Sequence, residues 1–180
     1  CSFGDASITE GEVAESFQMS ALKKLPILYL VQDNEWDISA HASEMRAVDA
    51  THYAKGFGLK TYTIDGTDFT KSYETIQKAF KEIRKKRTPI LIHAKVPLLN
   101  HHTSGVRMEW YRDDLMEAKN RDPFPKLKAE LLKKGFTAKD LIQIDKKAKI
   151  LVENDYKKAL KAEDPTPEDL FLHDFSPTPI

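Results

Sequence analysis

The sequence predicts an α/β protein with a doubly wound, mostly parallel sheet and a C-terminal helical extension. Short apolar runs of strand length alternate with segments of helical periodicity over residues 1–96. Strands that are separated by helices form parallel sheets with helices on both faces. Polar residues follow the strand candidates directly, as is typical of the ligand-binding edge of such sheets.

Each element of the α/β part has its own signal. The chain starts close to the end of a strand that leads to Gly4, and residues 11–24 have helical spacing with small residues for close packing. The run ILYLVQ is continuously apolar, as a strand buried on both faces should be. The remaining expectations are a loop over 33–43, a helix over 44–57 ended by Gly56 and Gly58, a strand over 59–65, a helix over 66–87 capped by Asp68, and a strand over 88–96.

The C-terminal part reads as helices. A long loop over 97–112 precedes helical pieces, a helix over 123–134 that ends in Gly135, and a lysine-rich helix from the Thr137 cap to about 162. An apolar stripe on this last helix predicts that it lies against the body of the protein. We therefore divide the chain into an α/β domain (1–112), a helical extension (113–162) and a proline-punctuated linker (163–180).

The charge balance excludes some partners. Lysine plus arginine and aspartate plus glutamate both total 28, so no net charge attracts nucleic acid or an anionic membrane surface. No apolar run approaches the roughly 20 residues that span a membrane, and no signal peptide is visible. A single cysteine suits the reducing cytoplasm, where we expect the protein to be. The chain lacks an initiating methionine, and we expect it to be a piece of a longer polypeptide.

Two strand ends carry candidate metal ligands. Asp5 follows the first strand and Asn34 follows the second, and together with the backbone carbonyl of Trp36 they offer the hard oxygen ligands that Mg²⁺ prefers. Gly4 lets the backbone approach a diphosphate, and the backbone amides around Ala6 and Ser7 favour an anion. Asp and Asn after a strand are also ordinary turn chemistry, which is the more common reason for them, so both interpretations stay open.

A third segment at the same edge of the sheet contains two histidines. His101 and His102 lie in the loop that follows the strand over 88–96. Adjacent histidines in a loop are more often solvated than catalytic, so the pair alone predicts little.

The ordered motifs resemble a known family. The stretch GDASITEGEVAESFQMSALKKLPILYLVQDNEWDIS resembles the thiamine-diphosphate motif, in which a Gly-Asp-Gly segment precedes an Asn pair by about 30 residues. It is most similar to the alpha part of the decarboxylating component of 2-oxoacid dehydrogenase complexes. The matching features are Glu10-Gly11, Asn34, Trp36, Ile38-Ser39, the turn IDGTD over 64–68, and the loop NHHTSG with the downstream Tyr111-Arg112.

The resemblance implies a site, a reaction and partners. It implies thiamine diphosphate and Mg²⁺ as cofactors, with the metal on Asp5, Asn34 and the Trp36 carbonyl, and His102 as the catalytic residue that reaches the diphosphate, the substrate or a lipoyl arm. The reaction is decarboxylation of pyruvate or a branched-chain 2-oxoacid with acyl transfer to a lipoyl group. The implied partners are the 2-oxoacid, the lipoyl domain of an acyltransferase component and a beta-like pyrimidine domain on the same or a second chain, in a dimer or larger assembly. The implied cofactor-binding residues are Gly4, Asp5, Ala6, Ser7, Gln32, Asn34, Trp36 and His102.

Some positions depart from the family pattern. Ala6 replaces a glycine, Asp33 replaces the first Asn, Gln32 stands where arginine is common, and Leu98 replaces an arginine. These changes lower the positive charge around a diphosphate. The family's other cofactor contacts come from segments outside these 180 residues, so we expect the isolated chain to be inactive and to derive from a fused alpha–beta chain. The alternatives are a transketolase-like enzyme and a non-catalytic assembly module of the same fold.

Overall fold

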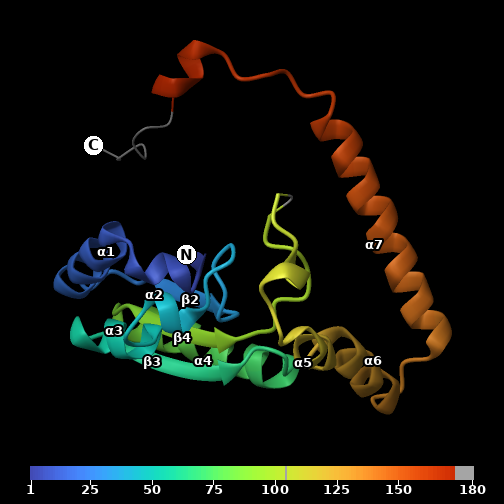
Figure 1. Ribbon diagram of the computed structural model, residues 1–180, viewed down its shortest axis with the longest axis horizontal. Helices are drawn as coiled ribbons and strands as arrows, with labels where there is room; N and C mark the ends of the chain where they lie inside the picture. The colour runs from blue at the N-terminus through green and yellow to red at the C-terminus, as the bar shows by residue number, and fades with distance from the viewer. Residues whose placement is uncertain (104, 173–180) are drawn as a thin grey trace. The chain divides into compact units, whose positions relative to one another are not determined.

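Four parallel strands form the centre of the protein. The computed structural model describes residues 1–103 and 105–172, which fall into two compact units, 1–131 and 132 onward. The first unit contains one parallel sheet in the order β1-β2-β4-β3 (Figure 1). The strands are β1 (Ser2–Gly4), β2 (Leu28–Asp33), β3 (Lys60–Asp65) and β4 (Ile90–Lys95). The predicted parallel α/β class is confirmed.

Helices cover both faces of this sheet. On one face, α1 (Gly11–Leu22) and α3 (Ala50–Gly56) pack through Phe17 and Ala54 onto Tyr29 and Val31. On the other face, α4 (Phe69–Lys86) packs through Ala79 onto the alternate strand positions Ile90 and Ile92. Successive strand residues point to opposite faces, so the continuous apolar runs of β2 and β4 supply both layers. The doubly wound arrangement is thus confirmed.

The prediction of one helix over 44–57 is wrong, because the structure has two short helices in this region. His41 caps α2 (Ala42–Met45) in a capping box with Glu44, and Asp49 caps α3 by accepting a hydrogen bond from the backbone N–H of His52 at 2.9 Å. Two caps eight residues apart start two helices, and the helix is interrupted between them, where Arg46 is extended at φ −140° and ψ 136° and a bend follows it at 47–48. This extended residue brings a guanidinium to the edge of the sheet.

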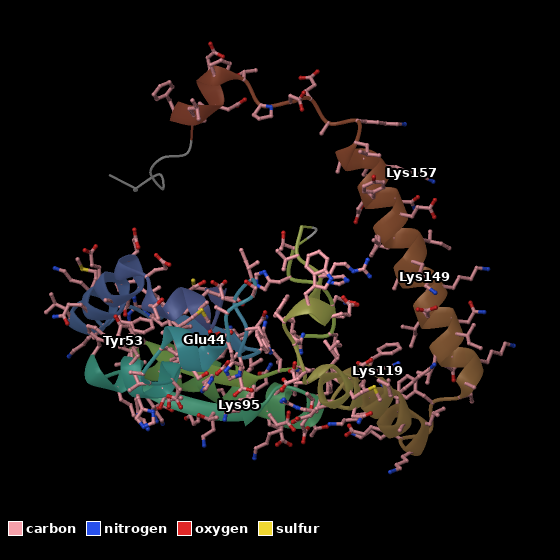
Figure 2. The ribbon with its side chains drawn as sticks, viewed as in Figure 1. Glu44, Tyr53, Lys95, Lys119, Lys149 and Lys157 are labelled. Carbon is pink, nitrogen blue, oxygen red and sulfur yellow. The ribbon has the colours of Figure 1, made fainter. Side chains whose placement is uncertain are left out.

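The C-terminal helices follow the prediction closely. Thr137 caps α7 in a capping box with Asp140, and Lys149 and Lys157 project from this helix (Figure 2). Ile144 and Leu151 of its apolar stripe are exposed, so the expected packing against the body stays a prediction, as do the domain boundaries at 112 and 162. The elements are η2 (Met108–Trp110), α5 (Leu115–Asn120), α6 (Pro123–Lys133), α7 (Ala138–Ala159) and η3 (Pro167–Phe171).

Two parts of the predictions lie outside the described residues. These are Ser104 in the histidine loop and residues 173–180 of the linker. Within the described residues, none of the helices combines the length and the apolar character that crossing a membrane requires.

Candidate functional site

The strand register brings the predicted site segments to one edge of the sheet. Gly4 of β1 pairs with Gln32 of β2, and Asp33 pairs with Lys95, which ends β4 and is labelled in Figure 2. Parallel strands end together, so the residues just after them meet outside the same edge. Asp5 follows β1 directly, at the start of the short helix η1 (Ala6–Thr9), and Asn34 follows β2.

The three predicted metal ligands lie in one hydrogen-bonded chain. The backbone N–H of Asn34 donates to Asp5 Oδ1 at 3.3 Å, and the backbone N–H of Trp36 donates to Asn34 Oδ1 at 2.9 Å. Glu35 between them adopts φ 66°, in the left-handed region, and its N–H donates to Asp33 Oδ1 at 3.0 Å. This tight turn after β2 therefore places the backbone N–H of Asn34 beside the carboxylate of Asp5, which is 29 residues away in the sequence.

Residues from beyond the histidine loop hold Trp36 in place. The buried Trp36 ring lies under the Arg112 guanidinium at 5.4 Å and contacts the Tyr111 ring edge-on at 5.4 Å. Arg112 donates to both carboxylate oxygens of Asp114, at 2.7 and 2.8 Å, and to the Leu98 carbonyl at 2.9 Å. The Tyr111-Arg112 pair thus closes the loop that begins at β4 and fixes the turn that carries Asn34 and Trp36.

A cluster of buried charged groups surrounds Asp5. Arg46 donates through Nη1 to Asp5 Oδ2 at 2.8 Å and through Nη2 to Asp33 Oδ1 at 2.9 Å. His93, fully buried in β4, contacts Asp33 Oδ2 through Nε2 at 2.5 Å. The negative charge of Asp33 is therefore paired with the Arg46 guanidinium, and its second oxygen is hydrogen-bonded to His93.

The cluster shifts the pKa values of Asp5 and Asp33 in opposite directions. Burial, with the neighbouring Asp33 charge, raises the pKa of Asp5 to about 6 despite the opposing effect of Arg46. Burial also acts to raise the pKa of Asp33, but the hydrogen bonds from His93 and Arg46 outweigh it and hold that pKa well below its usual range. The two carboxyl groups titrate as a pair, and Asp5 takes up a proton first.

The remaining predicted residues are distributed unevenly around this centre. Gly4 and the half-buried Ala6 and Ser7 flank Asp5, and the side-chain position of Gly4 faces open space. Gln32 is exposed on β2. His102 lies exposed in the loop after β4 and, among the described residues, it forms no hydrogen bond with the Asp5–Trp36 cluster. Its catalytic role stays a prediction.

A cavity of about 480 Å³ opens beside the candidate ligands. Asn34 and Trp36 line one side, and Glu117 and Arg121 from α5 and its end line the other. This cavity is open to solvent and adjoins the turn that carries Asn34 and Trp36.

Sequence reasoning missed Arg46 and His93. Arg46 was placed inside a continuous helix, where it would not reach the sheet edge, and His93 was counted as part of an apolar strand. A signal was present: Asp33 ends a strand buried on both faces, and a buried carboxylate needs a partner. Burial of the Asp33 carboxylate therefore predicts a basic group close to it but does not identify the residue.

The oxygen donors at this site fit Mg²⁺. One carboxylate, one amide oxygen and one backbone carbonyl are a sparse protein set, which Mg²⁺ accepts when phosphate oxygens and water complete its octahedron. The described residues contain no group of three His, Cys, Asp or Glu side chains that could hold a metal by themselves. The fit therefore depends on the Asp5–Asn34–Trp36 set.

The fold and the site define an α/β protein with oxygen donors clustered at the carboxyl edge of a parallel sheet. The family model described as "Dehydrogenase E1 component" matches residues 1–168, and the chain belongs to that family. The predicted resemblance to the alpha part of this component is confirmed by its relatives.

Two curated relatives show the extent of the similarity. The chain is 26% identical over 175 residues to the pyruvate dehydrogenase E1 component subunit alpha of Rickettsia bellii, covering 93% of this chain and 52% of the relative. It is 30% identical over 154 residues to the subunit of the same name from Rhizobium meliloti, covering 83% and 44%. The chain thus spans about half the length of the curated relatives it matches.

Among solved structures, the transketolase of Campylobacter jejuni superposes with a TM-score of 0.48 at 23% identity. That superposition covers 53% of this chain and 15% of the transketolase.

Proposed function

We propose that this chain supplies the diphosphate- and metal-binding half of the thiamine diphosphate site in the decarboxylating component of a 2-oxoacid dehydrogenase. The hydrogen bond between the Asn34 N–H and Asp5 Oδ1 carries this proposal. It supports a single binding point built from two strand ends, and the membership of the dehydrogenase E1 component family supports the reaction class.

Each residue of the site has a proposed role. Asp5, the Asn34 amide oxygen and the Trp36 carbonyl hold Mg²⁺, while the backbone at Gly4, Ala6 and Ser7 receives the diphosphate. Gln32 offers a neutral contact at the edge of this site. The bound thiamine diphosphate supplies the electron sink for decarboxylation, which no side chain could provide. The protein residues orient that cofactor, and the packing of Arg112 on Trp36 keeps the ligand turn rigid.

The rest of the reaction requires other parts. We propose pyruvate or a branched-chain 2-oxoacid as the substrate and a lipoyl domain of an acyltransferase component as the acyl acceptor, with His102 in contact with one of them. A beta-like pyrimidine domain, on the same chain or on a second one, completes the cofactor site in a dimer or larger assembly.

One observation favours a second candidate, a non-catalytic assembly module of this fold. The Asp5 carboxylate, which the enzyme needs for its metal, is paired with Arg46 at 2.8 Å. A permanent pair would leave the metal without its only charged ligand.

The test uses the protein in its full natural length. We expect reduction of ferricyanide that depends on a 2-oxoacid, Mg²⁺ and thiamine diphosphate, with pyruvate and branched-chain 2-oxoacids compared side by side. Asn34→Ala should weaken calorimetric binding of thiamine diphosphate with Mg²⁺ by about tenfold to 100-fold, as loss of a metal-site residue does. Asn120→Ala, at the end of α5, is the matched control and should leave binding unchanged.

The outcomes separate the candidates. Cofactor binding without turnover of any 2-oxoacid favours the assembly module and contradicts the enzyme. Absence of cofactor binding, with the protein folded, contradicts the proposed site itself.

A further inference from the structure

Arg46 places a fixed positive charge inside the proposed metal site. Its guanidinium bridges Asp5 Oδ2 and Asp33 Oδ1 at 2.8 and 2.9 Å, and only 9% of its side chain is exposed. A planar guanidinium presents two separate nitrogen donors, one to each carboxylate, which suits this bridging geometry. In this conformation Arg46 supplies one positive charge to the two carboxylates.

The two carboxylates depend on Arg46 to different degrees. Asp33 has two further donors, the N–H of Glu35 at 3.0 Å and His93 Nε2 at 2.5 Å. The other bond to Asp5 is the longer one from the Asn34 N–H at 3.3 Å, on Oδ1. Release of Arg46 from the cluster would therefore free Asp5 Oδ2 and leave Asp33 well satisfied.

The local backbone allows this release without unfolding a helix. Arg46 ends α2 in an extended conformation, and α3 starts only at Ala50. The Asp33 carboxylate can keep one arm of the guanidinium while the other arm leaves Asp5.

We infer that Arg46 is an internal competitor for the metal, which holds Asp5 in the metal-free protein and withdraws from Asp5 Oδ2 when Mg²⁺ binds. This inference rests on the proposed function, since it concerns the same carboxylate. Any group that stabilises the metal-free state lowers the apparent affinity for the metal by its own contribution. Asp33, which departs from the family pattern, is the anchor that makes this competition possible.

The test measures Mg²⁺ alone as the probe, in the full-length protein without cofactor. Arg46→Met keeps the length of the side chain and removes the competitor. By calorimetry, its dissociation constant for Mg²⁺ should be about tenfold lower than that of the wild type, a typical size for coupling between two binding events. In EDTA the same variant should unfold at a lower temperature than the wild type, because two buried carboxylates are left without their shared cation.

A second variant protects the test against failure to fold. Asp33→Asn together with Arg46→Met removes the competitor and one of the two like charges, and it too should bind Mg²⁺ more tightly than the wild type. Arg84→Met, at an exposed position of α4, is the matched control and should change neither quantity.

Each result decides the matter. Tighter Mg²⁺ binding in either Arg46 variant supports the inference, and unchanged or weaker binding in the folded variants overturns it. A separate titration of the wild type with thiamine diphosphate and Mg²⁺ tests the proposed function. If that titration fails while the Arg46 variants still gain affinity for Mg²⁺, only the proposed function is lost.

Discussion

Asp5 and Asp33 share one guanidinium, yet the site shifts their proton affinities in opposite directions. Asp33 has three donors on its two oxygens, while Asp5 has one short bond and one long one. The weaker donor set leaves burial as the dominant effect on Asp5. At neutral pH most Asp5 groups remain ionised, and so the carboxylate is available for a cation.

The raised pKa of Asp5 predicts a pH dependence of stability. Between the unfolded value of 3.8 and about 6, the folded state keeps a proton that the unfolded state loses. The contribution of Asp5 to the free energy of unfolding therefore falls as pH rises through this window. Asp33, with a lowered pKa, acts in the opposite sense, and its contribution is fully present above the unfolded value.

Asp5→Asn removes this titration. Chemical denaturation at pH 4, 5, 6 and 7 should show that the variant gains stability relative to the wild type as pH rises, whatever its absolute level. Glu12→Gln, at an exposed carboxylate of α1, should show no such trend. A constant difference between Asp5→Asn and the wild type across the series would contradict the raised pKa.

Arg112 offers a second prediction at the level of single residues. Its side chain is fully buried. Arg112→Ala would remove the side-chain donor to the Leu98 carbonyl and, among the described residues, leave the Asp114 carboxylate with the longer bond from Trp36 Nε1 at 3.4 Å. Since the Asp114 side chain is 35% exposed, we expect a loss of about 2–3 kcal/mol in the free energy of unfolding, below the full cost of a broken buried pair.

Tryptophan fluorescence would report the local effect. In a Trp110→Phe background, which removes the exposed tryptophan, emission from Trp36 should shift to longer wavelength in Arg112→Ala. Arg107→Ala breaks only an exposed pair with Glu109 and should change stability by less than about 0.5 kcal/mol. An unshifted Trp36 spectrum would show that Arg112 does not hold this turn.

At the scale of elements, the turn from β3 to α4 is fixed by close packing as much as by its cap. Asp68 accepts a hydrogen bond from the Lys71 N–H at 2.8 Å and starts α4. Just before it, the Gly66 N–H donates to the Lys95 carbonyl at 2.8 Å, which ties this turn to the end of β4. The IDGTD motif is therefore explained here by a structural contact between two strand ends.

Gly66→Ala should destabilise the fold. An added Cβ would lie 2.5 Å from Val96 Cγ1 and 3.1 Å from the Lys95 carbonyl oxygen, so the backbone would have to move. We expect a loss of about 1–3 kcal/mol in urea denaturation, as for other overpacked sites. Val96→Ala in the same chain should recover part of this loss, and Gly56→Ala, which meets no atom within 4 Å, should be neutral or stabilising. Equal stability of the Gly66 and Gly56 variants would refute the packing argument.

The elements show which signals in the sequence were sufficient. Apolar runs predicted β2 and β4, and Asp68 and Thr137 predicted the starts of α4 and α7, because these signals act within a few residues. The sequence prediction missed the division between α2 and α3, although His41 and Asp49 are local caps. Residues 44–57 keep a helical periodicity, and that periodicity does not show that the chain is extended at Arg46. The proximity of the candidate ligands Asp5 and Asn34 could be predicted from sheet topology, whereas the Arg46 and His93 contacts depend on three-dimensional packing that no local pattern encodes.

At the scale of the whole molecule, we propose that the chain contributes one side of a binding site. The candidate donors at the sheet edge come from the ends of β1 and β2, and a solvent-connected cavity lies beside Asn34 and Trp36. The match to about half of each relative agrees with a site shared between this region and others. The activity is therefore a property we assign to the assembled protein.

Residues 1–180 alone should bind the cofactor weakly. The described chain offers three candidate metal ligands and a few backbone amides, with Arg46 competing for the charged ligand. Few fixed contacts must offset the cost of immobilising a flexible cofactor, so we expect a dissociation constant weaker than about 100 μM for thiamine diphosphate at saturating Mg²⁺. Calorimetry on the isolated chain, with circular dichroism to confirm its folding, measures this value beside the full-length protein. Micromolar affinity in the isolated chain would mean that these residues form a nearly complete site, and the shared-site argument would then be wrong.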